Sequence, residues 1–150
     1  MSVAQRLADL GLVLPEVPAP VAAYVPAVRS GAMIYTAGQL PFVSGELLRT
    51  GLVGDEVGVS DAVECARQCA LNALAAVASQ ANLDEIRVVK VVGFVASAAG
   101  FTAQPQVLNG ASELIGDVLG EKGVHARSAV GVAALPLNAP VEVEVIAEVL

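Results

Sequence analysis

The stretch from His125 to Ala147 constrains the fold more than any other part of the chain, and it reads HARSAVGVAALPLNAPVEVEVIA. It predicts two strands joined by a proline-bounded turn. The run from Ala129 to Leu135 is apolar and uncharged, which is typical of a strand buried on both faces. From Val141 to Val145 valine alternates with glutamate, which is typical of a strand with one face in the core.

Arg127 stands at the entrance of the first of these strands. A guanidinium keeps its proton near neutral pH and is costly to bury alone, so it needs a planar anion from the protein or from a ligand. If the two strands form a plain hairpin about Asn138, Arg127 is level with Glu148 and about 20 Å from Glu142. The two residues then meet only across a boundary between two copies of the chain, which predicts an interface site.

Length and composition favour one domain spanning residues 1–150. Apolar residues make up 55% and charged residues 15% of the chain, against roughly 45–50% and about 25% in typical soluble domains. The longest nearly uncharged run, Val91 to Phe101, is too short for a membrane span, and the N-terminus lacks the pattern of a secretory signal. We therefore expect a cytoplasmic homo-oligomer that contacts no membrane and buries its apolar excess between copies.

Several classes of chemistry lack the residues they need. The net charge is −7 and the basic residues are scattered, which argues against nucleic acid as a partner. No metal-ligand spacing and no phosphate-binding loop occurs in the sequence, so we expect no metal and no cofactor. The single histidine, His125, is interpreted as structural, and Cys65 and Cys69 as two core residues one helical turn apart.

The remaining patterns predict an α+β fold with a mixed sheet and two helices packed on one of its faces. The expected order is β-β-(β)-α-β-α-β-β. The expected elements are a helix over 2–10, an extended proline-rich arm to Val21, a hairpin of Val25–Arg29 and Met33–Ala37, a loop over 42–58 with at most a short strand at 46–50, a helix over 60–80 capped by Ser60, a central strand over 86–96, and a helix capped by Thr102 that runs to about Gly120.

Polar residues that lie among apolar ones are the candidates for a functional site: Tyr24, Gln39, Asn109, Arg127, Glu142 and Glu144. Each also has a structural explanation. Tyr24 covers a sheet edge, Gln39 satisfies a turn, and Asn109 faces solvent. The two glutamates form the solvated face of an edge strand, and one of them pairs with the arginine. The residues alone leave both explanations open.

Three segments together resemble the RidA/YjgF family, also called the endoribonuclease L-PSP family. They are Ala126–Val132 (ARSAVGV) followed by Leu135-Pro136, Val141–Ala147 (VEVEVIA), and Thr36–Pro41 (TAGQLP). Tyr24 stands where that family has a tyrosine, and Asn109 matches an asparagine of its second helix. The similarity runs from about Pro20 to the C-terminus, and the helix and arm over 1–19 precede it as an extension. Ala37 stands where the family often has serine, and Ala129 where many members have cysteine.

The resemblance implies a homotrimer of chorismate-mutase-like subunits with ligand clefts between neighbours. It also implies cofactor-free hydrolysis of reactive enamines and imines, such as 2-aminoacrylate, to 2-keto acids and ammonia. In this scheme Arg127 binds the substrate carboxylate and Glu142 holds or activates water. The residues that would line the cleft are Tyr24, Ala37, Gly38, Gln39 and Asn109.

Two other functions remain open at this stage. One is a non-catalytic trimer that binds small carboxylates or a protein partner through the same clefts. The other is the ribonuclease activity attached to some relatives, which the acidic charge balance disfavours.

Overall fold

The structure is a computed structural model and describes residues 1–17 and 23–150, so part of the predicted proline-rich arm (18–22) lies outside the described residues. The helices are α1 (Val3–Asp9), α2 (Val59–Ala78) and α3 (Gln104–Leu119), with 3-10 turns η1 (Leu83–Glu85), η2 (Gly120–Gly123) and η3 (Pro136–Asn138). The strands are β1 (Ala27–Ser30), β2 (Met33–Thr36), β3 (Phe42–Val43), β4 (Glu46–Leu47), β5 (Ile86–Ala96), β6 (Ala126–Val132) and β7 (Val141–Val149).

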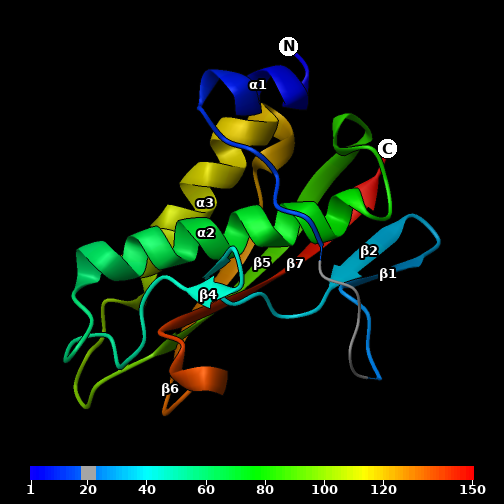
Figure 1. Cartoon of the computed structure of the whole chain (residues 1–150). Helices are drawn as coiled ribbons and strands as arrows, with labels where there is room; N and C mark the ends of the chain where they lie inside the picture. The colour runs from blue at the N-terminus through cyan, green and yellow to red at the C-terminus, as the bar shows by residue number, and fades with distance from the viewer. Residues whose placement is uncertain (18–22) are drawn as a thin grey trace.

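Five strands form one mixed sheet in the order β1-β2-β7-β5-β6. The β5 and β6 strands are parallel, because α3 carries the chain back between them, and the other neighbours are antiparallel. Figure 1 shows α2 and α3 on the same side of this sheet, and side chains from both helices join the strands in one hydrophobic core. The predicted α+β fold with helices on one face is therefore confirmed.

The last two strands do not form the plain hairpin that the distance estimate assumed. The β6 strand pairs with β5, and β7 lies between β2 and β5, where it forms hydrogen bonds along both of its edges. A turn through Leu137 and Asn138, both with positive φ, carries the chain from β6 to β7. The β6 strand is also an edge strand rather than one buried on both faces, and Val130 on it is 44% exposed. Apolar composition predicted burial there, but no helix among the described residues covers the side of the sheet on which Val130 lies.

The starts of the two long helices also differ from the prediction. Helix α2 begins at Val59 after Gly58, and α3 begins at Gln104 after Ala103, so neither Ser60 nor Thr102 is the capping residue. Pro105 lies in the first turn of α3. In α1 the Ser2 hydroxyl accepts a hydrogen bond from the Gln5 amide, a regular N-cap.

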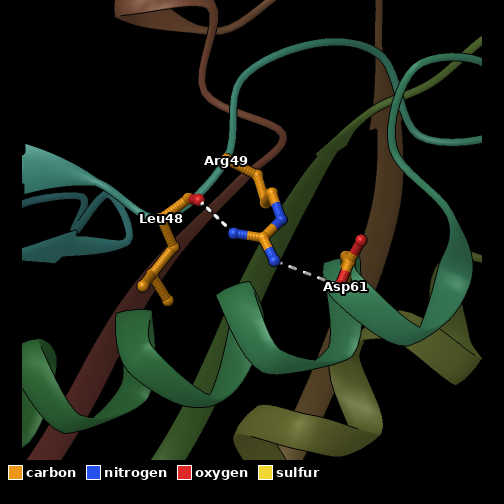
Figure 2. Close-up of polar contacts among 3 residues, drawn as sticks. All are labelled: Leu48, Arg49 and Asp61. Atoms are coloured by element: carbon orange, nitrogen blue, oxygen red, sulfur yellow. Dashed lines mark hydrogen bonds and ion pairs between the residues drawn. The ribbon is translucent and has the colours of Figure 1, made fainter.

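The segment over 42–58, expected to be mostly loop, contains the small hairpin of β3 and β4. Ser44 and Gly45 at its tip both have positive φ, which matches the twist of a two-residue hairpin turn. Arg49 then ties the following loop to α2: its Nη1 donates to the Leu48 carbonyl at 2.7 Å and its Nη2 lies 3.6 Å from Asp61 Oδ1 (Figure 2). Both charged side chains are more than half exposed, so this pair contributes at most about 1 kcal/mol.

Cys65 and Cys69 are buried and unpaired on α2, as predicted. Burial raises the pKa of the Cys65 thiol to about 11, and burial also raises the pKa of Cys69. Both thiols are therefore protonated near neutral pH and are poor nucleophiles. In the described part of the chain, no helix combines the length and hydropathy that crossing a membrane requires.

Two glycines inside α3 predict opposite effects on stability. A Cβ on Gly110 would overlap the carbonyl oxygen of Val63 on α2, whereas a Cβ on Gly116 would meet no atom within 4 Å. Gly110→Ala is expected to lower the free energy of unfolding by about 1–3 kcal/mol through overpacking. Gly116→Ala is expected to raise it by about 0.5–1 kcal/mol through helix propensity. Urea unfolding of both variants measures the difference, and equal shifts would contradict the packing described.

The face of the sheet opposite the helices carries many large apolar side chains beside the glutamates of β7. Strand register assigns to it alternate residues of five strands, of which the large apolar ones include Val28, Tyr35, Val92, Phe94, Val130 and Ile146. These side chains are half-buried or exposed, and no helix within residues 1–17 and 23–150 covers them. We call this surface the uncovered face. Its apolar residues contribute to the apolar excess in the composition.

Candidate functional site

Arg127 lies on β6 beside Val91, which faces the helices, and its side chain reaches α3. Its Nη1 donates to Asn109 Oδ1 at 3.0 Å and to Ser112 Oγ at 3.2 Å. Its Nη2 donates to the Pro105 carbonyl at 3.2 Å. The three acceptors lie on one face of α3, because their spacings of four and three residues match the helical turn.

These contacts leave one edge of the guanidinium available. Nη1 uses both of its hydrogens and Nη2 uses one, so the Nε–H and one Nη2–H have no partner among the described residues. Among the described residues, the arginines that form ion pairs are Arg49, Arg67 and Arg87, and Arg127 forms none. Nε and Nη2 share one edge of the planar group, which is the arrangement that binds a carboxylate through two parallel hydrogen bonds. The site therefore fits an external carboxylate.

A shallow hollow of about 360 Å³ lies next to Arg127 between α3 and β6. Its lining residues are Ser112, Gly116, Gly120, Gly123, Val124, His125 and Arg127. His125 contacts the Arg127 cluster through Ser112, since its Nε2 lies 2.9 Å from Ser112 Oγ. Its Nδ1 lies 2.6 Å from the carbonyl oxygen of Gly123.

Glu142 lies on β7 and points to the uncovered face, next to the segment that follows β2. Its carboxylate occupies the space where a Cβ on Gly38 would lie. The backbone of Gln39 fixes this segment against β7. Its N–H donates to the Val143 carbonyl at 2.8 Å, and its carbonyl accepts from the Val143 N–H at 3.0 Å. Partial burial raises the pKa of Glu142, and the negative charge of Glu144 raises it further.

Arg127 and Glu142 lie on opposite faces of the sheet. Arg127 is level with Val91 and Val145, while Glu142 is level with Phe94, three residues further along β5. The offset is about 10 Å along the strands and about 10 Å across them, and an odd number of residues reverses the side-chain direction. The two residues are therefore too far apart to meet within one chain. The earlier distance of about 20 Å assumed a hairpin that the structure does not contain.

The predicted site residues thus form two groups in one chain. Arg127 and Asn109 are brought together on α3 and β6, and Ala37, Gly38, Gln39 and Glu142 are brought together at β2 and β7. Tyr24 joins neither group through a hydrogen bond, and it is 68% exposed before β1. Within the described ranges, no three His, Cys, Asp or Glu side chains form a group that could hold a metal ion.

Sequence reasoning missed Ser112, the Pro105 carbonyl and the link to His125. The signal was present in the spacing of Pro105, Asn109 and Ser112, which predicts one face of a helix. What the spacing did not show is that this face points at β6, because that depends on the parallel pairing of β6 with β5.

Comparison with known proteins identifies the family. The model of the family described as Endoribonuclease L-PSP matches residues 15–149. The chain belongs to this family, also known as RidA/YjgF. The family expectation drawn from the ARSAVGV, VEVEVIA and TAGQLP segments is therefore confirmed, and the observed fold is that of YjgF structures.

Three relatives show how this RidA/YjgF chain compares with others. Protein TCP17 of Trypanosoma cruzi is 44% identical over 149 residues, which cover 97% of this chain and 93% of TCP17. The crystal structure of Atu1372 from Agrobacterium tumefaciens, described as of unknown function, is 49% identical with a TM-score of 0.91. The match covers 98% of this chain and 92% of the Atu1372 chain. E. coli TdcF, crystallised with bound serine, is 26% identical with a TM-score of 0.62. The match covers 89% of this chain and 93% of the TdcF chain.

Proposed function

We propose that this RidA/YjgF protein hydrolyses small reactive enamines and imines that carry a carboxylate, such as 2-aminoacrylate, to 2-keto acids and ammonia. The observation that carries the proposal is the guanidinium of Arg127, which three neutral acceptors hold while its Nε–Nη2 edge stays available. The serine bound to TdcF is a small amino acid whose carboxylate has the chemistry that this edge would bind.

We further propose that the protein is a homotrimer in which each site combines residues of two copies. Arg127 and Glu142 lie on opposite faces of one sheet, so a site that uses both needs Arg127 from one copy and Glu142 from its neighbour. The uncovered face supplies an apolar surface for such contacts, because exposed strand residues such as Val130 and Tyr35 gather there. Burial of this face between copies would remove the apolar excess from water.

The reaction in this site needs positioning and one proton relay. An enamine substrate first becomes the imine, because its terminal carbon takes up a proton from solvent and its nitrogen gives one up to solvent. Arg127 holds the carboxylate, and ionised Glu142 removes a proton from water while the water oxygen bonds to the imine carbon and the imine nitrogen takes up a proton from solvent. The resulting carbinolamine then loses its hydroxyl proton to solvent, the carbon–nitrogen bond breaks, and Glu142 returns its proton to the departing nitrogen. The products are the 2-keto acid and ammonia.

The other proposed site residues would shape the cleft. Asn109 orients Arg127 through its Oδ1 atom and leaves its amide nitrogen available toward the ligand. Gly38 gives the Glu142 carboxylate its space, since any side chain there would displace it. Ala37 and Gln39 border this position, and exposed Tyr24 would cover the ligand from the arm before β1.

The raised pKa of Glu142 predicts the pH profile. A carboxylate acts as a base only when ionised, so kcat/KM is expected to fall as the pH decreases through the raised pKa of Glu142. This fall is expected at a higher pH than an ordinary glutamate would give. Glu144→Gln removes the second cause of the shift and is expected to move this acid limb to lower pH. Glu148→Gln is the control, because Glu148 lies on the same strand as Glu142 but pairs with Arg87 of β5, and an unchanged limb is expected. An acid limb that Glu144→Gln leaves in place would contradict the assignment to Glu142.

The activity is tested by generating 2-aminoacrylate in situ and measuring the rates of pyruvate and ammonia formation with and without the protein. The proposal predicts a rate that rises in proportion to protein concentration above the spontaneous hydrolysis. A rate that equals the spontaneous one at every protein concentration, with imines of several chain lengths, would overturn it.

A second candidate function is a non-catalytic trimer that binds small carboxylates, and the relative with bound serine favours keeping it. It predicts binding of 2-keto or amino acids that depends on Arg127, together with no turnover of any imine. The ribonuclease activity named in the family description finds less support here. A net charge of −7 opposes the counterion release on which phosphate-backbone binding depends.

A further inference from the structure

We propose that His125 is a positioning residue for Arg127 and acts through the hydroxyl of Ser112. Three contacts connect these residues into one chain of hydrogen bonds, from the Gly123 carbonyl through the imidazole and the hydroxyl to the guanidinium. The role rests on the proposed function, because a ligand carboxylate is what the positioned guanidinium would bind.

The direction of each hydrogen bond follows from the first one. A carbonyl oxygen only accepts, so the contact of 2.6 Å between Nδ1 and Gly123 places the ring proton on Nδ1. In the neutral imidazole Nε2 is then an acceptor, and the Ser112 hydroxyl donates to it at 2.9 Å. With its proton directed at His125, the oxygen of Ser112 presents a lone pair to Nη1 of Arg127 at 3.2 Å.

Without His125, the Ser112 hydroxyl would lose this partner. A serine inside a helix readily turns its hydroxyl to a backbone carbonyl of the preceding turn, and Ser112 lies in the middle of α3. That rotation would withdraw the acceptor from Nη1, so the guanidinium would have Asn109 and Pro105 as its remaining partners. The Nε–Nη2 edge would then sample more orientations, and a carboxylate would bind more weakly.

The imidazole spectrum tests the proton position without any ligand. His125 is the single histidine of the chain, so an untagged protein labelled with ¹⁵N-histidine gives one set of imidazole signals. With the ring neutral, the expected spectrum shows a proton on Nδ1 and none on Nε2. A proton on Nε2 would overturn the proposed chain, because Nε2 could then not accept from Ser112.

A double-mutant cycle on the affinity for pyruvate, measured by calorimetry, tests the coupling. Ser112→Ala is expected to weaken binding about 10-fold, and His125→Phe, which keeps a planar ring without nitrogen atoms, about 3–10-fold. Because His125 acts through Ser112, the double variant should bind no more weakly than Ser112→Ala alone. Ser112→Thr, which keeps the hydroxyl, should bind pyruvate with an affinity within about 2-fold of the wild type. Losses that multiply in the double variant, or unchanged affinity in either single variant, would overturn the positioning role.

The same measurements separate this role from the proposed function. If the wild type binds pyruvate with the coupling described but hydrolyses no imine, the proposed reaction fails while the positioning role stands. If the imine is hydrolysed and the losses are additive, the positioning role fails while the reaction stands. If the wild type binds no pyruvate up to tens of millimolar, the carboxylate site is absent, and the positioning role is overturned with it. Thermal unfolding of each variant shows that the comparison is between folded proteins.

Discussion

Arg127→Ala is expected to lower kcat/KM for a carboxylate-bearing imine by about 10²–10⁴-fold, because two hydrogen bonds to a charged group are lost at about 1.5–3 kcal/mol each. The loss should appear in the affinity for the 2-keto acid product as well, since the carboxylate is bound in both states. Steady-state kinetics on an imine generated in situ, together with calorimetric titration of pyruvate, measure the two quantities.

Arg127→Lys separates geometry from charge. Lysine keeps the positive charge but cannot donate two parallel hydrogen bonds from one planar edge, so most of the loss should persist. The stability of Arg127→Ala should change by at most about 1 kcal/mol, because Asn109 and the other acceptors it leaves are exposed or half-buried and can bind water. Full activity in Arg127→Ala would remove Arg127 from the mechanism.

Glu142→Gln is expected to lower kcat by about 10²–10⁴-fold with little change in KM, because the amide keeps the shape of the carboxylate but cannot take up a proton from water. The half-buried position next to Gly38 should accept the substitution without rearrangement, since no atoms are added. Single-turnover kinetics with the same imine measure the chemical step separately from product release.

Glu148→Gln provides the matched control for this second variant, because it makes the same chemical change on the same strand. Its kcat should remain within about 2-fold of the wild type, since Glu148 pairs with Arg87 far from Gly38. A kcat for Glu142→Gln equal to that of Glu148→Gln would show that Glu142 is not the base.

Much of the fold could be predicted because its signals are local. The β-branched run over 86–96 forms β5 with the predicted boundaries, and the Ser30-Gly31 turn signal marks the observed hairpin of β1 and β2. The pairing of β6 could not be predicted from local pattern. It depends on α3 returning the chain parallel to β5, and a proline-bounded turn between two strands is equally compatible with a hairpin.

The candidate site shows the same division. The chemistry of Arg127 and Glu142 was evident from residue type, since a guanidinium among apolar residues needs an anion and a glutamate between valines lies on one face of a strand. The Ser112 hydroxyl, which accepts from Arg127, and its link to His125 were not evident, because both depend on the packing of α3 against β6. That Arg127 and Glu142 lie on opposite faces of the sheet could be derived only from the observed register of β6, β5 and β7.

Each site is proposed to combine Arg127 of one copy with Glu142 of another, and co-expression of Arg127→Ala with Glu142→Gln tests this arrangement most directly. Each variant alone should be nearly inactive. In randomly mixed oligomers about one site in four receives both intact residues, so about a quarter of the wild-type activity should return. Activity that stays at the level of the single variants, while native mass spectrometry shows mixed oligomers, would contradict a site shared between copies.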